Sequence, residues 1–163
     1  MSIRATVVAG YDWYTPIEEP DETYVNYTMN PAVRIPWHGL VYHDTHLITW
    51  YTGDGQSKVP AYWDHKDLFN ILYGTMPLFM PPDGQFWREH REKFLTSYHL
   101  ISPVSRRTMT AKLMRHEFIT PDRLVQQTHF DNGWSVTANF SENTVETAAG
   151  HLPPKGFQAD GDD

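Results

Sequence analysis

The spacing of apolar side chains separates a first part of the sequence, which predicts helices and buried strands, from a last part that predicts antiparallel strands. Short apolar runs at 38–42 and 76–80 are typical of strands buried on both faces. Residues 64–73 and 83–101 instead carry apolar side chains at helical spacing. This order of strand, helix, strand, helix predicts a parallel sheet with helices packed on it.

The expected helix boundaries rest on capping residues. Asp64 and Asp83 are of a type that caps helix N-termini, and Gly74 is suited to end the first helix in a left-handed conformation. Pro103 predicts the start of a third helix, reaching about residue 114, because proline is favoured at the first helical position.

The last third of the chain alternates strictly between apolar and polar positions. Residues 123–130 and 134–140 predict two strands, and the Asp-Asn-Gly sequence at 131–133 predicts the hairpin turn between them. The stretches at 144–147 and 156–159 predict two more short strands. An antiparallel sheet is therefore expected to follow the helical part.

The N-terminal region predicts an extended surface loop. Residues 14–36 contain four prolines, which interrupt any regular element, and the acidic cluster at 18–22 is expected to be solvated. A loop of this length is uncommon in a compact domain, so it also favours a chain that is part of something larger.

Composition and charge exclude several classes of protein. With 163 residues, of which 40% are hydrophobic and 20% charged, the chain is expected to fold. The net charge is −7 and no basic run exceeds two residues, so no nucleic-acid partner is expected. No apolar stretch could span a bilayer and no signal-peptide core is visible, so we expect no membrane partner and, by default, a cytoplasmic location.

Aromatic and polar side chains concentrate between residues 37 and 63. Trp and Tyr faces stack on sugar rings, while His and Asp hydrogen-bond to hydroxyl groups. The substrate-binding residues that this segment predicts are His43, Asp44, Trp50, Tyr51 and Asp54. Packing of the same aromatic side chains under a helix explains the pattern about equally well.

No cofactor or metal site is expected from the sequence. His43 and Asp44 are adjacent, so on a strand they would point to opposite faces, and no histidine spacing matches a known metal motif. The absence of cysteine excludes disulfides and thiolate ligands. Glycoside hydrolysis requires paired carboxylates, and only Asp44 and Asp54 lie where substrate is expected, so the catalytic residues stay unassigned.

Five stretches in the same order carry a resemblance to a known family. They are RIPWHGLVYHD (34–44), WDHKDLFNILYGTMPLFM (63–80), FITPDR (118–123), QQTHFDNG (126–133) and VTANF (136–140). Together they resemble bacterial glycoside hydrolases related to the endo-α-N-acetylgalactosaminidases and α-N-acetylgalactosaminidases. The resemblance implies a (β/α)8 barrel followed by a β-sandwich, and a retaining mechanism with an Asp nucleophile and a Glu acid/base on earlier barrel strands.

The resemblance leads to a specific expectation for fold class and domains. The fold would be α/β followed by all-β: residues 1–115 supply the last two strand–helix units of the barrel after a proline-rich loop, and residues 116–163 form a small antiparallel β-sandwich. The catalytic pair is not expected in this chain, so whether the chain alone is an enzyme is left open. The missing N-terminal barrel portion is the expected protein partner.

The expected function is that of the C-terminal portion of a retaining glycoside hydrolase acting on α-linked sugars of glycans. The chain would contribute part of the sugar subsite, and its ligand would be a glycan or small sugar. The alternative is a non-catalytic carbohydrate-binding or interaction domain. An exposed Trp134 would favour that alternative, but the alternation of residues 134–140 predicts that Trp134 faces the core.

Overall fold

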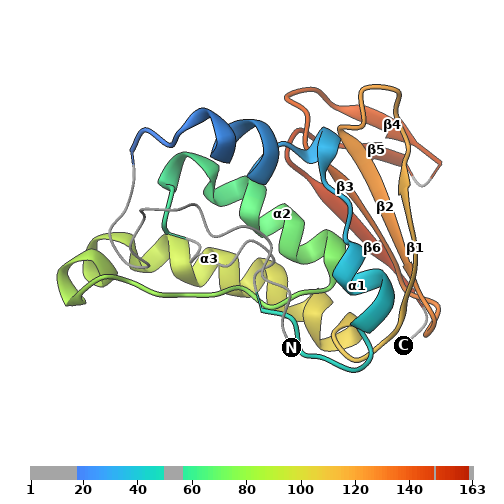
Figure 1. The fold of residues 1–163 in the computed structure, drawn as a ribbon, viewed down its shortest axis with the longest axis horizontal. Helices are drawn as coiled ribbons and strands as arrows, with labels where there is room; N and C mark the ends of the chain where they lie inside the picture. The colour runs from blue at the N-terminus through green and yellow to red at the C-terminus, as the bar shows by residue number, and fades with distance from the viewer. Residues whose placement is uncertain (1–17, 50–56, 149, 162–163) are drawn as a thin grey trace.

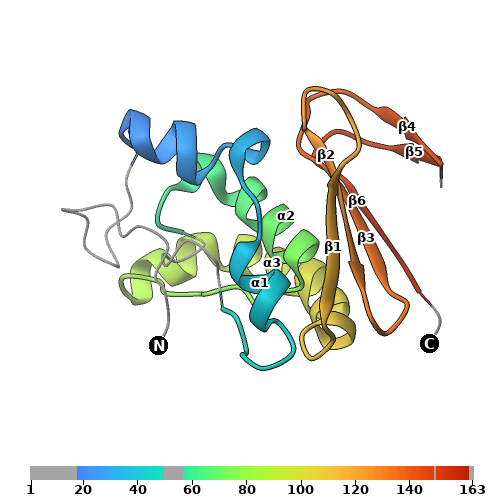
Figure 2. The same cartoon turned by 45° about the vertical axis from the view of Figure 1, so that its right-hand side comes forward.

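A layer of helices packs against one face of an antiparallel sheet. The computed structural model describes residues 18–49, 57–148 and 150–161. Figures 1 and 2 show the helices on one side of the sheet that the C-terminal strands form. The helical elements are η1 (Tyr24–Thr28), η2 (Pro31–Val33), α1 (Trp37–Tyr42), η3 (Pro60–Tyr62), α2 (Trp63–Tyr73) and α3 (Gly84–Thr108).

The strands form a four-stranded and a two-stranded antiparallel sheet. The strands are β1 (Leu113–Phe118), β2 (Val125–Phe130), β3 (Ser135–Asn139), β4 (Val145–Thr147), β5 (Gly150–Leu152) and β6 (Phe157–Asp160). The larger sheet has the order β1-β2-β3-β6, and β4 pairs with β5. In Figure 2 the β4–β5 hairpin lies beyond one end of the larger sheet.

Helices and sheet share their hydrophobic core. Phe69 of α2 packs on Phe140, which follows β3, with 4.7 Å between ring centroids. On the same helix, Ile71 belongs to a buried cluster with Val136 of β3. The Thr128 hydroxyl of β2 donates to the carbonyl of Leu72, so a polar bond also joins α2 to the sheet.

The expected ends at Gly74 and Asp83 and the hairpin turn are confirmed, whereas the expected cap at Asp64 is wrong, because Asp64 lies in the first turn of α2 and the N-cap residue is Tyr62. Gly74 ends α2 at φ 64° in the left-handed region. Asp83 caps α3, since its carboxylate accepts a hydrogen bond of 2.7 Å from the amide of Phe86. Gly133, at φ 87°, lies in the turn that joins β2 to β3.

The strand predicted at 38–42 is wrong, because these residues form the helix α1. Its amides bond to carbonyls four residues earlier, as in the 3.1 Å bond from His43 to Gly39. A short apolar run fits a buried strand and a buried helix equally well, and here the helix formed. The strand predicted at 76–80 is reduced to one parallel bridge between Thr49 and Met76.

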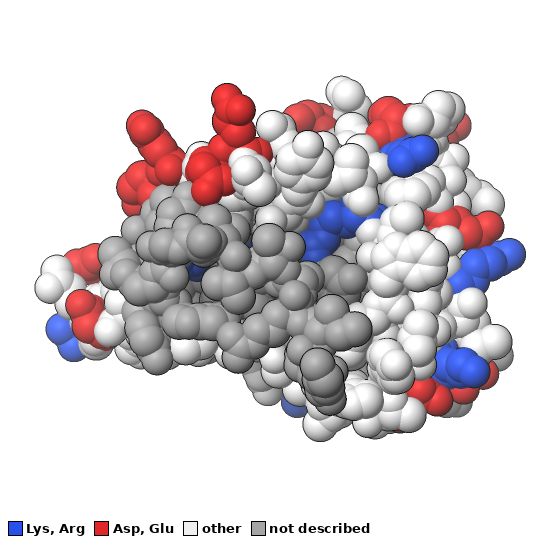
Figure 3. All heavy atoms as spheres, viewed as in Figure 1, with Lys and Arg blue, Asp and Glu red and all other residues white. Residues whose placement is uncertain are grey.

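Two further expectations also differ from the structure. Pro103 lies inside α3 and does not start a new helix, because Ile101 and Val104 beside it are both buried and hold the helix on the core. The expected N-terminal loop forms the short helical turns η1 and η2 from Tyr24 onward. Its acidic cluster at 18–22 is exposed, and Figure 3 shows acidic side chains gathered over these turns.

The structure thus has helices followed by antiparallel strands, which confirms this part of the expected fold class. The barrel units and the sandwich stay predictions. Within the described residues, no helix has the length and apolar character needed to cross a membrane.

Gly74 provides a test of the packing where α2 ends. A Cβ at this position would lie 2.8 Å from Thr108 Oγ1 and 3.0 Å from both His43 Nε2 and Phe130 Cζ. We expect Gly74→Ala to lower the free energy of unfolding by about 2–4 kcal/mol, the sum of left-handed strain and overpacking. Urea denaturation monitored by circular dichroism measures the change.

Gly133→Ala is the matched control. Gly133 has positive φ as well, but a Cβ there meets nothing within 4 Å. This variant should therefore lose only about 1 kcal/mol, from backbone strain alone. Equal losses in the two variants would show that the contacts around Gly74 do not constrain the fold.

Candidate functional site

The end of α1 carries the first of the residues predicted to bind sugar. His43 is the C-cap residue of α1 and only 2% exposed. Its Nδ1 lies 2.7 Å from the carbonyl oxygen of Ala111, and its Nε2 lies 2.9 Å from that of Tyr73. The ring also packs on Phe130 of β2, at 5.4 Å between centroids.

These contacts make His43 a connection between three parts of the chain. Tyr73 is the last residue of α2, and Ala111 lies between α3 and β1. A neutral imidazole has one N–H and donates to one of the two carbonyls, whereas an imidazolium donates to both. In either state the His43 ring holds the end of α1 against Tyr73 and Ala111, and both ring nitrogens face protein atoms.

Asp44 lies one residue further along and is exposed. The turn around it is fixed by backbone bonds of 3.0 Å from the amides of Thr45 and His46 to the carbonyl of Tyr42. Its carboxylate is therefore presented to solvent on a defined turn. His43 and Asp44 are thus neighbours in sequence that lie on the inside and the outside of the molecule.

The other three predicted binding residues, Trp50, Tyr51 and Asp54, lie outside the described residues.

Sequence reasoning missed a group of rings beside Asp44. His38, Tyr42 and His46 lie with centroids 5.1 to 5.9 Å apart in each pair. Partial burial, followed by the nearby His46, lowers the pKa of His38. The four-residue spacing of His38 and Tyr42 was the available signal, but it appears only when the segment is taken as a helix.

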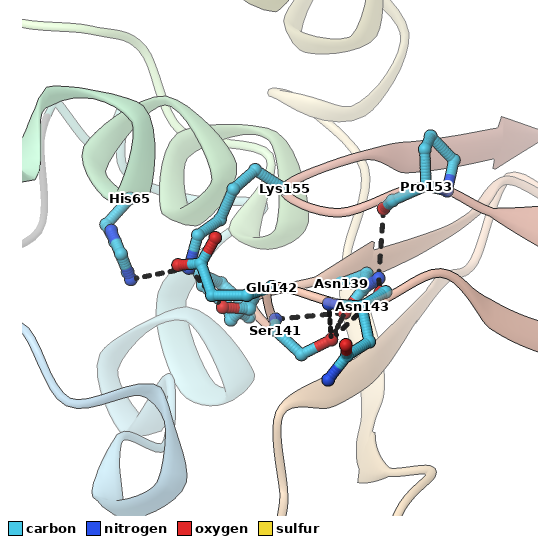
Figure 4. A network of polar contacts seen from close by, with 8 residues as sticks. His65, Asn139, Ser141, Glu142, Asn143, Pro153 and Lys155 are labelled. Carbon is cyan, nitrogen blue, oxygen red and sulfur yellow. Dashed lines mark hydrogen bonds and ion pairs between the residues drawn. The ribbon is translucent and has the colours of Figure 1, made fainter.

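A second polar cluster joins α2 to the loop before β6, as Figure 4 shows. The ammonium group of Lys155 lies 2.9 Å from Glu142 Oε1 and 3.3 Å from His65 Nε2, and it also donates to the carbonyl of Phe140. Burial, followed by the charge of Lys155, lowers the pKa of His65 to about 4. His65 is thus a neutral acceptor near neutral pH.

Asn139 organises the loop that carries Lys155. Its amide nitrogen donates to the carbonyls of Asn143 and Pro153 at 2.8 and 2.9 Å, and its oxygen accepts from the amide and hydroxyl of Ser141. These partners lie in one loop region, but Lys155 reaches a helix residue 90 positions earlier. No local sequence signal predicts that contact.

Comparison with known proteins identifies the family of the chain. Residues 11–129 match the model of the glycosyl hydrolases related to the GH101 family, GH129. The match includes α1, α2, α3, β1 and most of β2, and therefore the turn that presents Asp44. The chain belongs to family GH129.

Solved structures similar to this GH129 chain agree with the assignment. One is a quadruple mutant of α-N-acetylgalactosaminidase NagBb from Bifidobacterium bifidum, with 27% identity and a TM-score of 0.52 over 66% of this chain. Another is NagBb in complex with GalNAc, with 22% identity and a TM-score of 0.50 over 76% of this chain. A search of curated proteins found no match.

The GH129 chain corresponds to a small part of these structures. It spans 16% of the first NagBb chain and 20% of the second. Among its described residues, no group of three or more His, Asp or Glu side chains is suited to hold a metal ion.

Replacement of His43 tests its role as a connection. We expect His43→Ala to lower the free energy of unfolding by about 2–4 kcal/mol, because a cavity forms and buried carbonyl groups lose their partner. His46→Ala, in the same segment but exposed, should change it by no more than about 0.5 kcal/mol. Urea denaturation of both variants checks this, and similar effects would contradict it.

The lowered pKa of His65, about 4 against an ordinary 6.5, makes stability depend on pH. Between these values the unfolded chain binds the proton and the folded chain does not, so stability should fall as the pH drops from 6.5 to 4. Because the side chain is partly solvated, we expect a loss of about 2 kcal/mol at most.

His65→Gln should make the stability of the chain less dependent on pH across this window, since glutamine accepts a hydrogen bond without titrating. His99→Gln, at an exposed position on α3, is the control and should keep the pH dependence of the parent chain. Thermal unfolding measured over the pH range gives the comparison. An unchanged profile in His65→Gln would contradict the assignment.

Proposed function

We propose that this chain acts as the C-terminal portion of a retaining glycoside hydrolase that removes α-linked sugars, with α-linked N-acetylgalactosamine as the sugar. The observation that carries the proposal is the GH129 match across residues 11–129. The similar solved structures support the choice of sugar, since they are of an α-N-acetylgalactosaminidase, one of them in complex with GalNAc.

The parallel bridge between Thr49 and Met76 supports a place in a barrel. The Met76 amide donates to the Ile48 carbonyl at 3.0 Å, and α2 lies between the two bridged positions in sequence. A strand, a helix and a parallel strand form the repeating unit of a (β/α)8 barrel. We infer that these positions belong to neighbouring strands of such a barrel and that the antiparallel strands belong to a following sandwich.

We assign the sugar contact to the segment after α1. Asp44 supplies an exposed carboxylate that accepts hydrogen bonds from sugar hydroxyls, and His43 fixes the turn from the inside through its contacts with Tyr73 and Ala111. Trp50, Tyr51 and Asp54 follow within the same segment as the proposed stacking and polar residues.

Bond cleavage is assigned to carboxylates elsewhere in the full enzyme. Retaining hydrolysis needs two carboxyl groups about 5 Å apart, one on each side of the scissile bond. The sugar-binding segment offers Asp44 as its exposed carboxylate among the described residues. The chain is therefore proposed to position the sugar without cleaving it.

The alternative, a carbohydrate-binding module built on the sheet, has less support. Trp134 is partly buried and packs against the core cluster around Ile71. The Arg107 guanidinium lies over its ring, 5.0 Å from the centroid. The guanidinium group thus covers one face of this ring, and the partly buried ring presents less of its surface to a sugar.

Titration of the chain with N-acetylgalactosamine tests the proposal. We expect weak binding, followed by NMR through shift changes at residues 38–49, and about tenfold weaker binding in Asp44→Asn, because a hydrogen bond to a charged acceptor is lost. Glu146→Gln, on β4 and away from this segment, should bind as the parent chain does. Unchanged affinity in Asp44→Asn would contradict the assignment of the subsite.

Hydrolysis of an aryl α-N-acetylgalactosaminide tests whether this chain positions the sugar without cleaving the bond. The purified chain should show no turnover, since the nucleophile and the acid/base are proposed to lie in another part of the full enzyme. Turnover that disappears in Asp44→Asn would show instead that this chain contains catalytic machinery.

A further inference from the structure

The outward side of α1 is apolar and exposed. Trp37 and Val41 are 68% and 57% exposed, and they are four residues apart, so they lie on the same side of the helix. The inward side is also non-charged, with Gly39 and His43 buried against their neighbours. The helix α1 thus has no Asp, Glu, Lys or Arg on its outward side, whereas a helix that faces solvent typically carries charged side chains there.

Exposed apolar side chains continue on both sides of this helix. We call the surface formed by Ile35, Trp37, Val41, Tyr42 and Leu47 the α1 face; all five side chains are at least 36% exposed. More than half of the large apolar side chains exposed in the described residues belong to residues 27–47. Exposed apolar side chains gathered in this way mark an interaction surface, whereas scattered ones do not.

In the sequence, the α1 face is followed at once by the parallel bridge. Leu47 is two residues before Thr49, which forms the bridge to Met76. Among the described residues the parallel pairing does not continue beyond this bridge, and a further strand beside it would extend the pairing as at a sheet edge. An apolar helix face and a sheet edge at adjoining positions fit a partner that supplies both strands and apolar side chains.

The lengths of the similar proteins indicate what that partner is. This chain spans 16% and 20% of the two NagBb chains, so most of such an enzyme lies outside the part that it resembles. We propose that the α1 face is an interface, covered in the assembled enzyme by the barrel-forming part of a GH129 glycoside hydrolase. This inference rests on the proposed function, and it adds which surface of the chain makes the contact.

The test places the chain inside a full-length enzyme. In a chimera, this chain replaces the matching segment of B. bifidum NagBb, and hydrogen exchange of residues 37–42 is compared with that in the free chain. We expect exchange about tenfold slower or more in the chimera, because coverage suppresses local opening of α1. Unchanged exchange, or a chimera that does not fold, would overturn the proposal.

Substitution provides a second measurement with a matched control. Val41→Asp should leave the unfolding midpoint of the free chain unchanged, since the side chain is exposed, but should abolish or sharply lower the yield of folded chimera. Met114→Asp, at a residue 56% exposed on β1 and outside the α1 face, should have no effect in either context. Equal effects of the two substitutions in the chimera would contradict the interface.

Two further outcomes separate this inference from the proposed function. A chimera with a protected α1 face that does not hydrolyse an aryl α-N-acetylgalactosaminide supports the interface and contradicts the function. Hydrolysis by a chimera in which residues 37–42 exchange as in the free chain contradicts the interface alone. Concentration-dependent dimerisation of the free chain that Val41→Asp abolishes would identify a second copy as the partner and also overturn the proposal.

Discussion

The contact between the helices and the sheet depends on the absence of a side chain at Gly74. Gly74 ends α2 in the left-handed region, and a Cβ there would be within 3.0 Å of side chains from His43, Thr108 and Phe130. These three residues come from the ends of α1, α3 and β2. Four elements therefore meet at one point, and the close approach exists only because that residue is glycine.

The position of the proposed sugar contact follows from this meeting point. His43 reaches the carbonyls of Tyr73 and Ala111, on either side of the packed region, and so holds the end of α1 in place. Asp44 is the next residue and is turned to solvent. The sequence predicts that His43 and Asp44 bind sugar together, but only Asp44 is exposed. The buried His43 holds the end of α1 in place and thereby fixes the position of Asp44.

The predictable parts of the structure are those with local causes. Gly74, the Asp83 cap and the turn at 131–133 depend on residues within a few positions, and all three were expected from sequence. The partners of His43 lie 30 and 68 positions away, and no spacing rule identifies them. The run at 38–42 fits a strand as well as a helix because short apolar runs carry no reliable period, and its ring cluster can be predicted only from the helix.

The two proposals concern adjoining surfaces of one short segment, and this has a consequence for the enzyme as a whole. Tyr42 belongs to the α1 face, and Asp44, two residues later, is the exposed carboxylate of the proposed subsite. If the α1 face is covered by the barrel-forming part, Asp44 stands at the rim of that contact. In the proposed enzyme, a sugar bound at Asp44 would touch both parts of the protein, so the barrel-forming part could supply the carboxylates that cleave the bond.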